Sequence, residues 1–172
     1  MKYRITPIER ERVMREDDFI VSKTDLKGRI TYCNQIFIEF SGYTERELIG
    51  SPHNIVRHPD MPRGLFRLLW QTLRSERECF AYIKNMAKDG GYYWVFATVT
   101  PSFDGEGKVI GYYSVRRAPK REAIEVMEDI YRQMLRAENE ARTADQPDAS
   151  LALLNKILNG RGTTYADFIV SI

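Results

Sequence analysis

The chain has 172 residues, 43% of them hydrophobic, and its 26 basic and 24 acidic residues leave a formal net charge of +2. A chain of this length buries one good core, and so balanced a charge argues against nucleic acid as the main partner. No apolar run approaches the roughly 20 residues that a membrane-spanning helix needs, and the charged start is unlike a secretory signal. Cys33 and Cys79 lack the spacing of a zinc site. We therefore expect a cytoplasmic protein with reduced thiols and no metal site.

The first part of the chain is typical of two short strands followed by a helix. Residues 1–18 are mostly charged and form either a mobile arm or an amphipathic cap on the domain or on a second subunit. Residues 19–23 and 29–33 are typical of strands joined by a tight turn. Asn34 can cap a helix that ends at Gly42.

Two further helices are predicted before the next strands. Thr44 and Glu47 have the spacing of a capping box and indicate a helix of one turn. Pro62 opens a longer helix. Its apolar residues recur at i, i+3, i+4 and i+7 and are Phe66, Leu69, Trp70 and Leu73. From this regular stripe alone, Trp70 is interpreted as a core residue.

Three more strands complete the predicted core, over residues 79–87, 92–101 and 108–117. The turns between them are rich in Asp and Gly, which tolerate the positive φ of tight hairpins. The predicted fold class is α+β, with a five-stranded antiparallel sheet and short helices on one face.

The pattern changes after the sheet. Residues 122–142 predict an amphipathic helix with about two heptads of apolar stripe, which is short for an independent coiled coil. This helix either contacts a partner or a second copy, or packs on the chain's own sheet. The expected organisation is an arm (1–18), a core domain (19–118), an amphipathic helix for a partner contact or dimerisation (119–142), and a linker, short helix and apolar tail (143–172).

A dense polar loop lies between the two sets of strands, from Pro52 to Pro62. Arg57 suits phosphate or carboxylate, because a guanidinium donates two parallel hydrogen bonds. His58 is a haem ligand, a donor to a cofactor or a structural residue, and Asp60 could simply favour the next helix N-terminus. As a cluster, these residues favour a ligand site.

Strand 79–87 alternates a face of small side chains, which includes Asn85, with an aromatic face. A buried amide costs roughly 1–3 kcal/mol if it is unpaired, so Asn85 needs a partner. That partner is either loop backbone or a planar heterocycle, and the space beside Asn85 favours the heterocycle. The aromatic face of the sheet must be covered, and it is predicted to hold Tyr82, Tyr92, Trp94, Phe96 and Tyr112.

No catalytic constellation is evident. Ser41 and Ser114 lack a base, the acidic residues form no metal or glycosidase motif, and no glycine-rich phosphate loop follows a strand. We therefore predict that the protein is not an enzyme.

Several of these motifs together resemble a known family. The pattern Asn34-x-x-Phe37-x-x-x-Ser41-Gly42-Tyr43, with Gly50, the last three strands and Gly111-Tyr112, resembles PAS sensory domains. More specifically, the run from Pro52 to Met61, with Trp70, Lys84-Asn85 and Tyr93-Trp94-Val95, is similar to the PAS domains of bacterial aerotaxis receptors. The similarity covers residues 19–117.

The resemblance implies a PAS fold that binds FAD and reports redox state. It implies that Asn85 lies near the isoalloxazine ring and that Trp70 lines the site. The candidate cofactor-binding residues are Asn34, His53, Arg57, His58, Asp60, Trp70 and Asn85. The chain departs from the family at Cys79, where tryptophan is common, and near Ala81, where glycine is common. The cysteine motif of light-sensing relatives is absent, so no photochemical adduct is expected.

We predict a FAD-binding redox sensor for aerotaxis that signals to a separate, membrane-bound transducer of the methyl-accepting chemotaxis type. The alternative partner is a second copy of the same chain, in a homodimer. The alternatives are a haem-binding gas sensor that uses His53 or His58, and a cofactor-free PAS module for protein–protein association.

Overall fold

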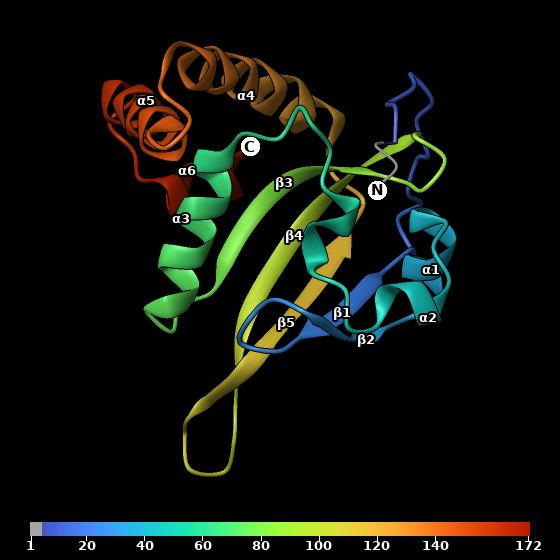
Figure 1. Ribbon diagram of the computed structural model, residues 1–172. Coiled ribbons are helices and arrows are strands. Elements are labelled where there is room, and N and C mark those ends of the chain that lie inside the picture. Colours follow the sequence, from blue (N-terminus) through green and yellow to red (C-terminus); the bar gives the residue numbers. More distant parts are fainter. Residues whose placement is uncertain (1–4) are drawn as a thin grey trace.

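The computed structural model describes residues 5–172 and is built around one five-stranded antiparallel sheet in the order β2-β1-β5-β4-β3 (Figure 1). The strands are β1 (Ile20–Thr24), β2 (Ile30–Cys33), β3 (Cys79–Met86), β4 (Tyr92–Phe103) and β5 (Val109–Arg117). The helices are α1 (Gln35–Ser41), α2 (Glu45–Leu48), the 3-10 helix η1 (His53–Val56), α3 (Arg63–Arg74), α4 (Arg121–Glu140), α5 (Gln146–Gly160) and α6 (Tyr165–Ser171). The predicted α+β class and its sheet are confirmed. Within residues 5–172, no helix is long and apolar enough to cross a membrane.

Local hydrogen bonds explain where the short helices begin and end. The Asn34 side chain accepts a hydrogen bond from the Phe37 N–H and caps α1, and Gly42 ends that helix in the left-handed conformation at φ 70°. Thr44 and Glu47 form a complete capping box at the start of α2. Both caps lie where the sequence predicted them, because each depends on residues only one turn apart.

The C-terminal segment is more helical than the sequence indicated. The linker predicted at the start of residues 143–172 is shorter than Pro147 indicated, because α5 already begins at Gln146. Pro147 lies in the first turn of α5, where the missing N–H of proline has no helical partner to lose. The predicted apolar tail is helix α6, which Thr164 caps by accepting from the Asp167 N–H. The polar loop also contains a turn of helix, η1.

The outer, aromatic face of the sheet shares one apolar core with α4, α5 and α6 of the same chain (Figure 1). The Tyr131 hydroxyl on α4 donates to the Tyr82 carbonyl at 2.7 Å, and the Tyr165 hydroxyl on α6 donates to the Phe80 carbonyl at 2.9 Å. The apolar stripe of α4 therefore packs on its own sheet. The sequence left open whether this helix contacts a partner or a second copy or packs on its own sheet, and the structure shows the packing.

Tyr112 is an exception to the predicted aromatic face. It lies on the inner face of β5 with Ser114 and Arg116, and its ring meets Trp70 of α3 edge-on with 5.3 Å between centroids. The prediction for Tyr112 is wrong because a one-residue shift in the period-2 alternation of a strand reverses the face of every side chain.

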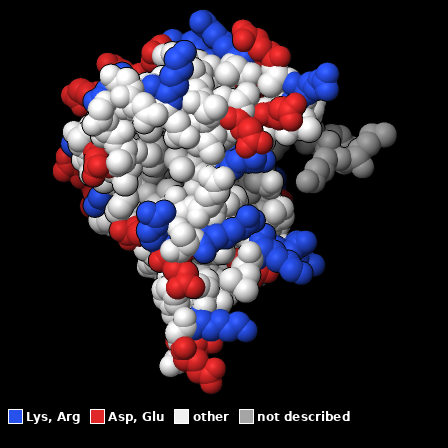
Figure 2. Space-filling view, turned by 90° about the vertical axis from the view of Figure 1, so that its left-hand side faces the viewer, with Lys and Arg blue, Asp and Glu red and all other residues white. Residues whose placement is uncertain are grey.

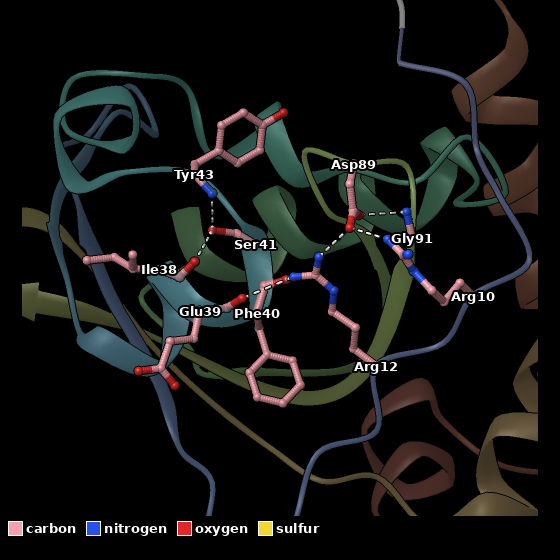
Figure 3. A network of polar contacts seen from close by, with 9 residues as sticks. All are labelled: Arg10, Arg12, Ile38, Glu39, Phe40, Ser41, Tyr43, Asp89 and Gly91. Atoms are coloured by element: carbon pink, nitrogen blue, oxygen red, sulfur yellow. Dashed lines mark hydrogen bonds and ion pairs between the residues drawn. The ribbon is translucent and has the colours of Figure 1, made fainter.

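The N-terminal arm lies along the sheet as a cap from Ile8 onward, with the first four residues outside the described part of the chain. Arg12 donates to the Phe40 carbonyl at 2.7 Å and to Asp89 at 2.6 Å, and Arg10 also pairs with Asp89 (Figure 3). The arm thereby joins the end of α1 to the β3–β4 turn. Each exposed ion pair contributes little alone, but the backbone ladder to Tyr92 fixes the path of the arm.

Charged residues are interspersed on the side of the molecule that carries α3 and α5. Figure 2 shows basic and acidic side chains around a broad uncharged area on this face. Charge alone therefore does not mark a partner surface on this side of the protein.

Substituting Met127 by Ala tests the packing of α4. Met127 is 0% exposed within the core shared by α4 and the sheet, so Met127→Ala is expected to lower the free energy of unfolding by about 2–5 kcal/mol. Urea denaturation measures the change. Glu128→Ala, at an exposed position on the same helix, is the control. Equal stability of the two variants would mean that α4 is not packed on the sheet in solution.

Candidate functional site

A cavity of about 300 Å³ lies between α3, η1 and the inner face of the sheet. Helix α3 contributes the apolar wall of Phe66, Leu69, Trp70 and Leu73, and the strands contribute small side chains such as Ala97. This volume is at the lower end of the about 300 to 1,000 Å³ that small-molecule sites occupy. The small face predicted for strand 79–87 therefore borders this cavity, at Ile83 and Asn85.

Four of the seven candidate residues line this cavity, and three lie elsewhere. The lining residues are His53, Arg57, Trp70 and Asn85. Asn34 is a structural residue, because its oxygen accepts from the Val21 and Phe37 N–H groups and its nitrogen donates to the Phe19 carbonyl.

His58 and Asp60 lie in the loop beside the cavity without lining it. His58 is 4% exposed, and its Nδ1 accepts a hydrogen bond from the Asp60 N–H at 3.1 Å. Burial and the positive charge of Lys84 lower the pKa of His58. Asp60 accepts from the Lys84 Nζ at 2.7 Å, next in sequence to Asn85. These residues fasten the loop to β3.

Asn85 has an unpartnered amide nitrogen at the cavity. The residue is 4% exposed, and its Nδ2 has no hydrogen-bond partner. The backbone of Asn85 bridges to Arg57, which brings the loop to the strand edge. An unpaired buried amide is costly, so a hydrogen-bond acceptor in the cavity would stabilise this arrangement.

Arg116 on β5 is the site residue that the sequence reasoning missed. Its side chain is 2% exposed, its Nη2 donates to the Ser22 Oγ at 2.5 Å, and its Nε and Nη1 have no partner. The guanidinium lies 4.5 Å from the centroid of the Phe37 ring. Burial lowers the pKa of Arg116 to about 10, so it remains charged at neutral pH. The alternation of β5, correctly placed, would have turned Arg116 inward with Tyr112.

No carboxylate balances this charge among the described residues that line the cavity. Two other cations line the cavity, and one of them, Lys27, is exposed. The second, Arg57, stacks over Phe66 with 4.1 Å to the ring centroid and donates to the Met61 carbonyl at 2.9 Å. The cavity therefore presents positive charge and free donors, which suit an electron-rich or anionic ligand.

His53 is held neutral beside Arg116. Its Nε2 lies 3.1 Å from the Ser22 Oγ, and its ring stacks on Phe37 with 5.6 Å between centroids. Burial, and then the charge of Arg116, lower the pKa of His53 to about 3. Although part of His53 faces the cavity, the imidazole thus adds no positive charge to it at neutral pH.

Cys79 packs with Leu69, Leu73 and Tyr112 in a small apolar cluster. Burial raises the pKa of the Cys79 thiol to about 11, so the thiol is protonated at neutral pH. A buried, protonated thiol is unreactive.

Comparison with known families decides what kind of domain holds this cavity. Residues 30–116, about half of the chain, match the family described as the PAS fold. The chain belongs to the PAS family. The matched segment contains the cavity-lining residues of η1, α3 and the last three strands of the PAS domain.

Two curated relatives contain PAS regions similar to this one. The chain is 43% identical over 117 residues to the aerotaxis receptor of Escherichia coli (strain K12), a match that covers 68% of this chain and 23% of the receptor. It is 30% identical over 97 residues to the nitrogen fixation regulatory protein of Klebsiella pneumoniae, covering 56% of this chain and 20% of that protein. The PAS protein thus spans about a fifth of the length of these relatives.

Solved structures share the fold. A light-oxygen-voltage domain studied with a flavin analogue superposes with a TM-score of 0.56 at 22% identity, covering 72% of this chain and 87% of that chain. The light-oxygen-voltage domain of a blue-light-activated histidine kinase from Erythrobacter litoralis gives a TM-score of 0.54 at 19% identity, covering 60% and 97%. At these identities the likeness concerns the PAS fold alone.

The lowered pKa of His53 predicts a loss of stability in mild acid. The unfolded chain binds a proton near pH 6.5, whereas folded His53 resists protonation down to about pH 3. The free energy of unfolding therefore falls as pH drops below about 6.5, by up to about 1.4 kcal/mol per pH unit from this residue. Urea denaturation at about pH 7 and about pH 5 is expected to give a shallower pH dependence for His53→Gln.

Asn54→Ala, an exposed substitution in the same turn with no titrating group, is expected to keep the wild-type pH dependence. If His53→Gln and wild type lose stability in parallel, His53 is not held neutral by the fold.

Proposed function

We propose that this PAS protein is a redox sensor for aerotaxis that holds FAD in the cavity and signals to a separate membrane-bound transducer. The observation that carries the proposal is the set of unpartnered donors on Asn85 and Arg116, both on residues that line one cavity. Buried donors without partners are rare in folded proteins, and an acceptor-bearing ligand would satisfy them.

The residues present suit a flavin. Its ring is planar and apolar on both faces, with carbonyl oxygens and ring nitrogens along one edge. Phe66, Leu69 and Trp70 offer an apolar wall to such faces, and the Asn85 amide can match the polar edge. The cavity of about 300 Å³ would enclose the ring system, and we infer that the rest of the dinucleotide lies outside it.

Arg116 would tune the response to electrons. A bound flavin supplies a group that takes up and releases electrons reversibly. Arg116 stabilises negative charge that develops at a ligand in the cavity, because no carboxylate among the described lining residues neutralises it. Because His53 is neutral, the positive charges at the cavity are the buried Arg116, the partly exposed Arg57 and the exposed Lys27. A change of ligand charge would thus alter hydrogen bonds of Arg116, Asn85 and the strands that carry them.

The likeness to the aerotaxis receptor supports the signalling part of the proposal, since that relative's PAS region is 43% identical to this chain. The match covers 23% of the receptor, so the output passes to another polypeptide or another segment. We infer that the receiver is a membrane-bound transducer of the methyl-accepting chemotaxis type.

The two alternatives have less support. A haem site could use His53, but His58 lies outside the cavity and its Nδ1 already accepts a hydrogen bond. A cofactor-free interaction module leaves the donors of Arg116 and Asn85 without a role.

Absorption spectroscopy of gently purified protein tests the proposal, followed by heat release and chromatography of the chromophore. Flavin bands and released FAD are expected. Arg116→Gln should weaken FAD binding by about ten- to a hundredfold, as the loss of a charge-assisted hydrogen bond implies, and should make the bound flavin harder to reduce.

Arg117→Gln is the matched control, because this neighbouring arginine is exposed and stacks on Phe96 of the opposite face. Asn85→Ala should weaken binding like Arg116→Gln. A Soret band would replace the proposal with the haem site. A colourless protein that takes up no added FAD, or equal potentials for the two arginine variants, would contradict it.

A further inference from the structure

Helix α3 is capped by a residue from another helix. The residue before α3 is Pro62, which offers no side-chain cap. Instead the Arg63 N–H donates to the Glu138 Oε1 at 2.6 Å, and the Gly64 N–H donates to the same oxygen at 3.2 Å. Glu138 is 5% exposed and belongs to the last turns of α4. A carboxylate of α4 therefore accepts hydrogen bonds from the first N–H groups of α3, as the side chain of a preceding Ser or Asp does in other helices.

Ser150 of α5 completes this cap. Its hydroxyl donates to the Glu138 Oε1 at 2.6 Å and accepts from the Gly64 N–H at 3.0 Å. A Cβ at Gly64 would clash with the Ser150 Oγ and with the Leu151 backbone nitrogen. Helices α3 and α5 thus approach at backbone distance, which leaves the start of α3 little freedom to move independently.

The capped helix is one wall of the cavity. One turn beyond the cap, Phe66 faces the cavity and lies under the guanidinium of Arg57. The negative charge of Glu138 also reaches Arg57, where it opposes the lowering of the Arg57 pKa that burial causes. A change at the cap therefore reaches both the apolar wall and a cavity cation.

The cap belongs to the C-terminal extension. The match to the PAS fold ends at residue 116, whereas α4, α5 and α6 follow it in the chain. Glu138 and Ser150 are thus contributions of the extension to a wall that the PAS domain itself provides.

We propose that Glu138 and Ser150 are positioning residues of the cavity, through which the C-terminal helices and the bound ligand control each other. The cap holds α3 in place, and a ligand packed on α3 in turn strengthens the contacts of α3 with α4 and α5. Because coupling between two sites is reciprocal, helices that favour the ligand are themselves ordered by it. The identity of the ligand rests on the proposed function, but the link between α3 and the extension does not.

Hydrogen exchange with and without FAD, together with the FAD dissociation constant, tests the proposal on the full chain. In the wild type, FAD is expected to slow exchange in α3 and also in residues 138–154. Glu138→Ala should speed exchange in α3 without any ligand and weaken FAD binding about five- to tenfold. It should also abolish the protection that FAD gives to residues 138–154, which a merely structural role would not do.

Matched variants separate the cap from general destabilisation. Glu138→Gln keeps an acceptor oxygen and should retain most of the coupling, and Ser150→Ala should lose part of it. Arg67→Ala removes an exposed ion pair between α3 and Asp148 of α5, and it should leave FAD affinity and hydrogen exchange in α3 unchanged. If Glu138→Ala does not fold, Ser150→Ala carries the test.

Two results would overturn the proposal. One is FAD protection confined to α3 and the strands, and the other is wild-type FAD affinity and α3 exchange in both Glu138→Ala and Ser150→Ala. If the wild type takes up no FAD, the proposed function fails; faster α3 exchange in Glu138→Ala would then still support the mechanical link.

Discussion

The guanidinium of Arg116 lies inside the domain, with Ser22 and Phe37 as neighbours and no carboxylate among the described residues that line the adjoining cavity. Removing a charge from water without a counter-ion costs several kcal/mol. The fold meets part of this cost with one hydroxyl contact and one aromatic face, and keeps His53 neutral beside the charge. What remains is a positive potential directed at a small cavity.

The sheet separates this polar chemistry from the apolar packing of the C-terminal helices. Because side chains alternate along β3, Asn85 borders the cavity while Lys84 and Tyr82 lie on the other side. The outer face is closed by α4, α5 and α6, whose core is continuous with Leu65 of α3. Helix α3 therefore touches both compartments, which explains why a residue of α4 can cap it.

Features that depend on neighbours in sequence were predictable. The cap at Asn34, the capping box at Thr44 and the hairpin turns each need only a few adjacent residues, so their patterns appear directly in the chain. Asn85 was also predictable, because an amide within a strand of small side chains has few alternatives to a pocket. His58 and Asp60 were grouped with Arg57 by proximity in sequence, yet a turn of the loop points them away from the cavity.

The sequence by itself determined the α+β class, the succession of strands along the chain, the starts of helices α1 to α4 and a polar site near the loop from Pro52 to Pro62. Only the tertiary structure decided which face of β5 is inward, and hence that Arg116 is the buried cation of the cavity, because register fixes the face and depends on pairing with distant strands. The same holds for the cap on α3. The Arg63 and Gly64 N–H groups are 75 and 74 residues from Glu138 in the sequence, and no local sequence pattern predicts a contact over that separation.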